Sequence, residues 1–192
     1  MEPNELHEAR TNPDFLECLE DLESKALESK SLSGLYQVLD SLLVLDLDEE
    51  RVHTVYQEIL KAAFNGIEDR LKEDEKLSLD NDDIFFIRSF YEHAIEKWSM
   101  NNAKGAKELF FILTQICEDE LLVEALNVHL IACSLDSDMD HFYEENVLHE
   151  QSHSEDKYGY FILDFKFDKK EYLNKHVDLL QKEFEELSHL LN

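Results

Sequence analysis

Residues 84–132 read IFFIRSFYEHAIEKWSMNNAKGAKELFFILTQICEDELLVEALNVHLIA and form the densest apolar segment of the chain. Apolar side chains recur every three or four residues before the polar turn Ser99–Asn102, and they do so again after it. This period puts one apolar face on each of two helices, which predicts an antiparallel helical hairpin. Ala125–Ala132 would belong to a third helix. The two faces consist of Ile84, Ile87, Phe90, Tyr91, Ala94, Ile95 and Trp98, and of Ala103, Ala106, Leu109, Phe110, Leu113 and Ile116.

The predicted hairpin resembles one tetratricopeptide repeat. The run Ala94–Trp98, the short polar turn, Ala106 and then Phe110 place small residues at the packing positions and an aromatic residue in each helix. His93 and Lys97 depart from the repeat, which has a Leu and an aromatic residue there, and no Pro closes the unit. The resemblance covers about a quarter of the chain.

Small acidic tetratricopeptide chaperones that hold secretion substrates are the proteins of this size that the chain resembles most. The resemblance implies a non-catalytic chaperone or adaptor that holds a helix or an extended segment of a client protein. Its groove would lie on the hairpin, with Phe90, Trp98 and Phe110 as the partner-binding residues.

The composition favours helices throughout. Only 4 Gly and 2 Pro occur in 192 residues, so the chain lacks the turn residues that sheets and Gly-rich nucleotide loops need. We expect an all-α protein whose helical hairpins stack as a bundle or as a short tetratricopeptide-like superhelix. We also expect one domain over residues 1–192, with a possible subdivision near 72–80 and disorder over residues 1–11.

Three helices are predicted before the hairpin. Asn12 and Pro13 form a strong helix start, and the segment Ser31–Gly34 ends that helix. The short helix that follows is so rich in leucine that it must be buried or bound, and burial is the preferred interpretation. A long amphipathic helix with its apolar face from Val52 to Ile67 comes next.

The formal charge of −27 comes from 45 acidic against 18 basic residues. Nucleic acids and anionic membranes are polyanions, so neither is an expected partner. The charge favours a basic or weakly folded protein client, although acidity also simply keeps a protein soluble. An alternative function is an acidic inhibitor that neutralises a basic protein, and mimicry of DNA is a lesser one.

The three cysteines are widely spaced and lie on predicted apolar helix faces, which is typical of reduced thiols in a cytoplasmic protein. Neither a signal peptide nor an apolar run long enough to span a membrane is recognisable. No nucleophile motif, phosphate-binding loop or dinucleotide fingerprint occurs, so no enzyme activity and no cofactor are predicted.

The remaining candidate site is a metal site. His141, Glu145, His149 and His153 lie four residues apart and would line one face of a continuous helix. Imidazole and carboxylate groups bind zinc and similar metals, so His141, Glu145 and His149 are the candidate ligands of a metal-binding helical protein. A solvated helix face with incidental histidines is the alternative. His93 and His129 are expected in or beside the core.

Asp136, Asp138 and Asp140 have the alternate spacing of a calcium loop. His141 stands where that loop requires Gly, and Val147 stands where it requires Glu. Capping of a helix that starts nearby is the better interpretation.

The segment Tyr158–Phe167 is ambiguous. Phe161, Leu163 and Phe165 alternate as in a strand, whereas Tyr158, Phe161 and Phe165 fit a helix. A helix is preferred because a lone strand would have no partner, and an exposed aromatic ligand-binding patch is the alternative.

One long helix is expected after Asp168. It would dock on the body of the protein, or else form a homodimer seam or a groove for a partner helix.

Overall fold

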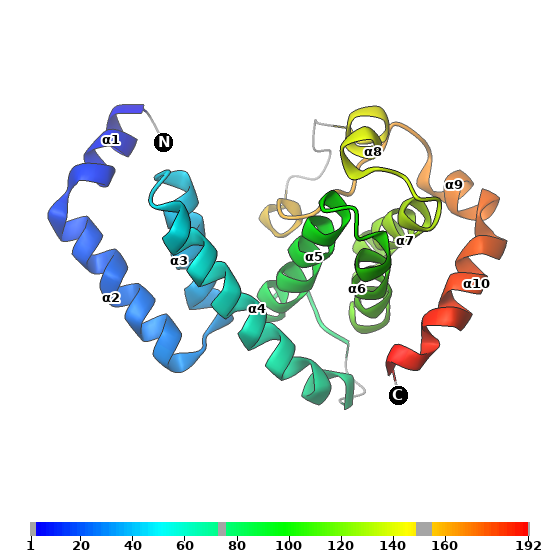
Figure 1. Cartoon of the computed structure of the whole chain (residues 1–192), viewed down its shortest axis with the longest axis horizontal. Helices are drawn as coiled ribbons and strands as arrows, with labels where there is room; N and C mark the ends of the chain where they lie inside the picture. Colours follow the sequence, from blue (N-terminus) through cyan, green and yellow to red (C-terminus); the bar gives the residue numbers. More distant parts are fainter. Residues whose placement is uncertain (1–2, 73–75, 149–154, 192) are drawn as a thin grey trace. The chain divides into compact units, whose positions relative to one another are not determined.

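The chain is helical in all the parts that the structure describes. The computed structural model describes residues 3–72, 76–148 and 155–191, and in these residues the chain forms ten α-helices and no β-strand (Figure 1). The predicted all-α class is therefore confirmed. No helix among these residues is both long enough and apolar enough to cross a membrane.

The chain divides into two compact units, Met1–Glu68 and Asp69–Asn192, which we call unit 1 and unit 2. The division lies just before the segment 72–80, where the sequence suggested a possible subdivision. Pro3–Thr11 forms helix α1, within the segment that was expected to be disordered. The single domain and the disorder of residues 1–11 stay predictions.

Unit 1 contains helices α1, α2 (Pro13–Ser29) and α3 (Leu32–Val44), and α4 (Glu49–Lys72) begins in it. The Asn12 side chain caps α2 by accepting a hydrogen bond from the Asp14 N–H at 3.0 Å, and Pro13 occupies the first turn, as predicted. Ser31 caps α3 through the Gly34 N–H at 3.2 Å. The predicted burial of the leucine-rich helix is confirmed, because α3 buries Leu35, Tyr36, Val38, Leu39 and Leu42.

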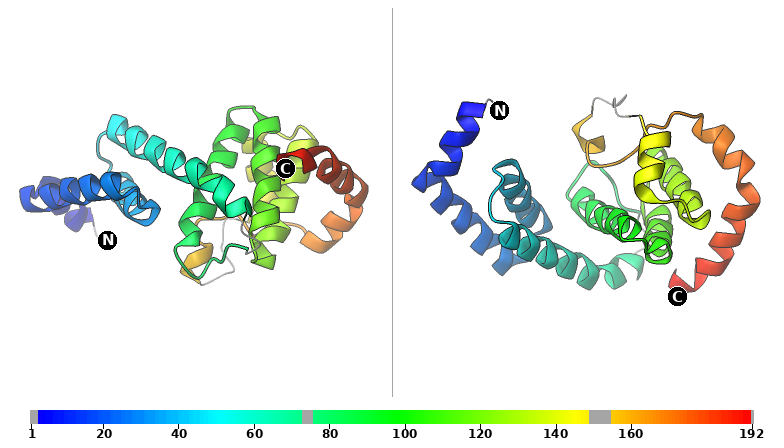
Figure 2. Two further views of the ribbon diagram at one scale, coloured as in Figure 1. Left: turned by 90° about the horizontal axis from the view of Figure 1, so that it is seen from below. Right: turned by 45° about the horizontal axis from the view of Figure 1, so that its top comes forward.

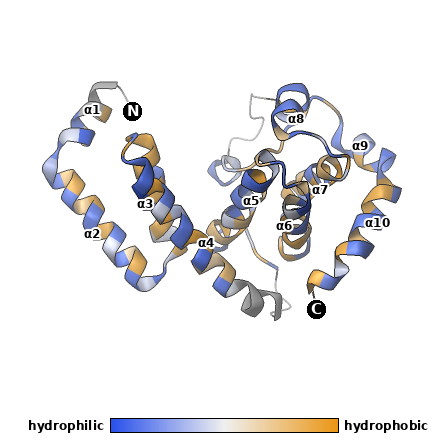
Figure 3. Cartoon of the chain, viewed as in Figure 1, coloured by the Kyte–Doolittle hydropathy of each residue, from blue (hydrophilic) through white to orange (hydrophobic). Residues whose placement is uncertain are grey.

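Gly34 lets α2 and α3 approach closely. A Cβ atom at this position would lie 3.0 Å from the Cβ atom of Ala26, so a larger residue would push the two helices apart. Figure 3 shows hydrophobic residues gathered along α3 and alternating with hydrophilic ones along α2. Helix α3 therefore forms the apolar centre of unit 1.

Unit 2 begins with the predicted hairpin. Helices α5 (Asp83–Ser99) and α6 (Ala103–Ile116) pack side by side across a turn in which Asn101 has a φ of 60°. Helix α7 (Glu120–Ser134) packs against α6 in turn. This packing of consecutive helices is compatible with a helical repeat.

Helix α7 lies at the centre of unit 2. The six consecutive residues from Val128 to Cys133 are all buried, so this helix has no solvent-exposed side over that length. Helices α6, α9 (Lys169–Lys175) and α10 (Val177–Leu187) pack against it, as Figures 1 and 2 show from three directions. A helix that is apolar all round is typical of the centre of a bundle. Unit 2 is therefore organised around α7.

The helix preferred for Tyr158–Phe167 is wrong. Only Asp156–Tyr158 forms a 3-10 helix, and the chain is then extended, with the side chains of Phe161, Leu163 and Phe165 buried in alternation. The chain after helix α8 (Met139–Asn146) supplies the missing partner, because Val147 and Phe165 form an antiparallel bridge. Burial of Phe161 and Phe165 removes these two side chains from the exposed aromatic patch that was the alternative.

The segment after Asp168 forms two helices, so the prediction of one long helix is wrong. α9 ends before His176, and α10 starts after it. The predicted docking on the protein itself is confirmed: the rings of Phe184 and Phe111 meet edge to face at 5.2 Å. Glu183 is buried and pairs with Lys107 of α6 at 2.6 Å.

Candidate functional site

The three aromatic residues predicted to bind a partner lie in the core. Phe90, Trp98 and Phe110 are 1%, 2% and 0% exposed. The Trp98 indole N–H donates a hydrogen bond to the Ser137 carbonyl at 2.7 Å, and its ring meets Phe110 edge to face at 6.2 Å. A partner cannot reach these side chains in this conformation. The prediction of a binding groove at these three positions is wrong, because α7 and the chain that follows it cover the hairpin.

His129 stands at the centre of this core, as predicted. It is fully buried, and its Nδ1 lies 2.6 Å from the Ala125 carbonyl oxygen. Burial lowers the pKa of the imidazole to about 4, which keeps the ring neutral. Its Nε2 has no hydrogen-bond partner among the described residues. The rings around it are those of Tyr91, Trp98, Phe110, Phe142 and Phe165.

His93 lies on α5, where its Nδ1 is 2.8 Å from the Glu96 carboxylate. The two residues lie within one turn of α5, and the His93 side chain is 15% exposed. His93 is therefore a boundary residue, in agreement with the prediction.

The candidate metal ligands are only partly described. His141 and Glu145 are exposed on α8, which ends at Asn146, while His149 and His153 lie outside the described residues. No continuous helix therefore carries Glu145 and His149 on one face. The described parts of the chain hold no group of three or more His, Cys, Asp or Glu side chains arranged for a metal. A site completed by His149 stays a prediction.

The Asp136–Asp140 run serves as a helix start. The Asp138 side chain accepts a hydrogen bond from the His141 N–H at 3.0 Å and so caps α8, while Asp136 has a φ of 53° in the preceding turn. This confirms capping as the role of Asp138.

The two buried cysteines are poor nucleophiles. Burial raises the pKa of the Cys117 thiol to about 11 and also raises the pKa of Cys133. Both therefore stay protonated at neutral pH, and only the thiolate attacks an electrophile.

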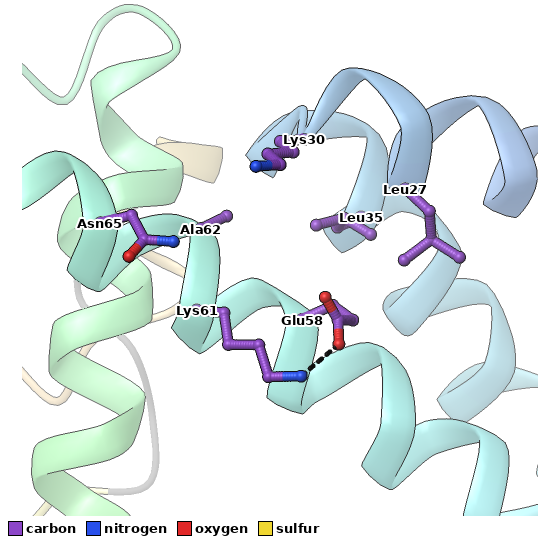
Figure 4. A pocket seen from close by; sticks show the side chains of 7 residues that line it. All are labelled: Leu27, Lys30, Leu35, Glu58, Lys61, Ala62 and Asn65. Atoms are coloured by element: carbon purple, nitrogen blue, oxygen red, sulfur yellow. Dashed lines mark hydrogen bonds and ion pairs between the residues drawn. The ribbon is translucent and has the colours of Figure 1, made fainter.

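An open pocket lies in unit 1, where the sequence predicted no site. It has a volume of about 160 Å³ and lies between the end of α2, the start of α3 and one face of α4. Figure 4 shows Leu27, Lys30 and Leu35 facing α4, and Lys61 turned toward Glu58. The residues that line the pocket are Leu27, Lys30, Leu35, Glu58, Lys61, Ala62 and Asn65.

The pocket has an apolar floor and a polar rim. Leu27 is 38% exposed, and Leu35 and Ala62 continue the apolar surface beside it. Glu58, Ala62 and Asn65 lie on one face of α4 because they are three or four residues apart. Apolar floors with a few polar groups at the edge are typical of binding sites in proteins.

The rim carries more positive charge than its surroundings. Residues 1–68 hold 5 basic and 16 acidic residues, and two of the five basic ones, Lys30 and Lys61, line this pocket. Lys61 forms an ion pair with Glu58 at 2.6 Å, whereas Lys30 has no ion-pair partner among the described residues. One cation of the rim is therefore offset by a carboxylate, and the other is available to a ligand.

Lys30 lies on the rim as the residue that caps the carboxyl-terminal end of α2. It has a φ of 53°, in the left-handed region, and its backbone N–H bonds to the carbonyl groups of the last turn. This conformation favours Gly or Asn. The other non-Gly residues with positive φ in the described chain are Asp46, Asn101 and Asp136.

The sequence offered only weak signals of this pocket. Ala62 is a small apolar residue on the otherwise polar face of α4, and the leucine-rich α3 raised the question of burial or binding. Neither signal says that Leu27 remains partly exposed beside Leu35. That depends on the angle at which α2 and α3 meet, which periodicity does not encode.

A smaller pocket of about 80 Å³ lies in unit 2 between α8 and the extended segment. One of its sides is formed by Tyr143, Val147 and Leu148. Its volume is half that of the pocket in unit 1.

Comparison with known proteins assigns the chain to no class beyond its all-α fold. The chain matches no protein-family model, and neither the curated proteins nor the solved structures contain a significant match to it. An all-α protein with an open pocket in unit 1 is the class that the fold and the site define. Its function must therefore be argued from the site.

Proposed function

We propose that the protein is a non-catalytic scaffold, a chaperone or adaptor, that holds a segment of a client protein. The observation that carries this proposal is the pocket of unit 1, which combines a partly exposed Leu27 with a polar rim. A client would insert one apolar side chain into this pocket and lay the neighbouring backbone along α2 and α4. This replaces the central hairpin as the proposed client-binding surface.

Two properties of the chain support a client over a small metabolite. The pocket is open and has room for one side chain rather than for a cofactor. The formal charge of −27 attracts basic or weakly folded segments over a distance and speeds their encounter with the pocket. The tetratricopeptide-like character and the cytoplasmic location belong to the same proposal.

The test is a comparison of two charge-matched variants of unit 1. Leu27→Glu places a carboxylate on the floor of the pocket, and Leu43→Glu adds the same charge at a side chain that is 54% exposed and outside the pocket. We expect proteins captured by the wild-type chain from its native cell extract to be lost with Leu27→Glu and kept with Leu43→Glu. Circular dichroism would establish that both variants stay folded.

Equal capture by all three proteins would overturn the pocket as the binding site. Capture that both variants keep and that high salt abolishes would instead favour the acidic inhibitor, since added carboxylates do not weaken a function that depends on the total negative charge.

A further inference from the structure

We propose that the pocket of unit 1 binds the carboxyl-terminal residue of a partner chain, with its apolar side chain on the floor and its carboxylate at Lys30. This inference rests on the proposed function and deepens it, because it states which part of a client the pocket selects.

The size of the pocket limits the ligand to one residue. An apolar cavity of roughly 150 Å³ binds a benzene molecule, so a volume of about 160 Å³ suits one aromatic ring or one branched aliphatic side chain. Leu27, Leu35 and Ala62 offer this group an apolar contact surface. A side chain such as that of Phe or Leu therefore fills the site.

The charge of the rim selects a carboxylate. Lys30 has no ion-pair partner among the described residues and stands at the edge of the apolar floor. Lys61 is paired with Glu58, but the Lys61 side chain is 66% exposed, and ion pairs at the surface contribute little stability. Lys61 can therefore turn from Glu58 toward a ligand at small cost, which would give the carboxylate two cations.

The ligand must carry an apolar side chain and a carboxylate within one residue, which points to the carboxyl-terminal residue of a chain. A carboxyl-terminal Phe or Leu presents an apolar side chain and a carboxylate on the same Cα atom. An internal residue has its carbonyl group in a peptide bond, so its backbone offers no carboxylate to Lys30.

The backbone at Lys30 agrees with a role for its side chain. A lysine in the left-handed region is less favourable than glycine, which would end α2 equally well. Glycine would remove the cation from the rim. The less favourable residue therefore stands where its side chain reaches the pocket.

The experiment uses two small probes that differ only in charge. N-acetyl-phenylalanine carries a free carboxylate, and N-acetyl-phenylalaninamide replaces it by a neutral amide. Both would be titrated into the full-length protein while the backbone amide signals of Leu27, Lys30 and Ala62 are followed by NMR. We expect the acid to shift these signals and to bind about tenfold more tightly than the amide, since hydrogen bonds to charged groups are stronger.

A pair of lysine variants provides the matched control. Lys30→Gln removes the proposed carboxylate contact, and Lys25→Gln removes the same charge from the same helix at a position outside the pocket. We expect the tenfold preference for the acid to vanish in Lys30→Gln and to persist in Lys25→Gln. Loss in both variants would mean that total charge and not Lys30 attracts the probe, which contradicts the inference.

Different results would overturn the carboxylate recognition at Lys30 and the client-binding function of the pocket. Equal binding of acid and amide at the pocket would overturn the carboxylate inference and leave the pocket as a site for apolar side chains. Binding of neither probe would overturn both. Signal shifts confined to residues outside the pocket would also overturn both, because the probe would then have found another surface.

Discussion

Lys30 is a single residue at which stability and binding are expected to oppose each other. Glycine suits the left-handed conformation better, because it has no Cβ atom to crowd the backbone. We expect Lys30→Gly to stabilise unit 1 by about 1 kcal/mol. Hydrogen exchange of the α3 amides measures this change in unit 1.

The same substitution at Lys25 serves as the control. Lys25 lies in the interior of α2, where Gly costs about 1 kcal/mol relative to good helix formers. We therefore expect opposite signs at the two positions. A destabilising Lys30→Gly would show that the lysine side chain, and not the backbone conformation, dominates at this position.

His129 makes the stability of unit 2 depend on pH. Its pKa falls from an ordinary 6.5 to about 4 in the folded protein, so folding favours the neutral ring. The stabilisation is present in full above pH 6.5 and is lost as the pH falls toward 4. The shift corresponds to about 3 kcal/mol.

His129→Leu removes this titration and keeps an apolar side chain of similar size in the aromatic cluster. We expect wild type to lose about 3 kcal/mol more stability than the variant between pH 7 and pH 4. Urea unfolding followed by the fluorescence of Trp98, whose ring lies 6.0 Å from His129, measures both proteins. Parallel pH profiles would contradict a buried neutral imidazole. The two proteins differ only at this position, so the difference between their pH profiles isolates His129.

At the scale of elements, α10 is held to unit 2 by a buried ion pair. Glu183 is 5% exposed and pairs with Lys107, which is itself partly exposed. Removal of one partner of a buried pair is strongly destabilising, and the partial exposure of Lys107 reduces the effect. We expect Glu183→Gln to destabilise unit 2 by about 2 kcal/mol in urea unfolding.

The neighbouring Glu185 is exposed and provides the control. We expect Glu185→Gln to change stability by less than about 0.5 kcal/mol, as surface substitutions usually do. Equal effects of the two substitutions would mean that the Lys107 contact contributes nothing beyond general charge.

The elements of unit 2 divide into those that local periodicity predicts and those that depend on packing. The α5–α6 hairpin was predicted because its apolar face repeats over both helices. The break at His176 and the extended chain after Tyr158 were missed, because each depends on a surface formed elsewhere. Phe161 and Phe165 keep the period of a strand, but the hydrogen bonds to the chain after α8 are made by their neighbours: the Leu148 N–H donates to the Asp164 carbonyl, and the Lys166 N–H donates to the Asn146 carbonyl.

Sequence periodicity predicts even less of the candidate site than of the helices, because the site depends on packing between elements. Periodicity identified the apolar face that contains Phe90, Trp98 and Phe110 but could not tell that α7 would cover it. The pocket combines residues from Leu27 to Asn65 on three helices, so no single stretch of sequence signals it. Capping was more predictable: Asn12 and Asp138 act within three residues of their own position.

At the scale of the whole molecule, the division into two units predicts that unit 2 folds alone. Residues 69–192 include Leu77, whose backbone N–H bonds to the Ile116 carbonyl at 2.7 Å and ties the start of the unit to the end of α6. We expect this fragment to be helical by circular dichroism and to unfold in one cooperative thermal transition.

A fragment that is helical but melts without cooperativity would contradict an independent unit 2 and would favour the single domain. Near-ultraviolet circular dichroism adds a second readout, since the single Trp98 of the chain lies in this core. A fixed indole signal equal to that of the full chain is the expected result.

The central position of α7 also constrains the synthesis of the protein. A ribosome releases this helix before α8, the extended segment, α9 and α10, which come later in the chain. The apolar run Val128–Cys133 therefore emerges when only the earlier helices, α6 among them, can cover it, and it stays partly open to nascent-chain chaperones until residues up to Leu187 have left the exit tunnel. Premature termination before Lys169 would make that exposure permanent and would mark the product for proteolysis.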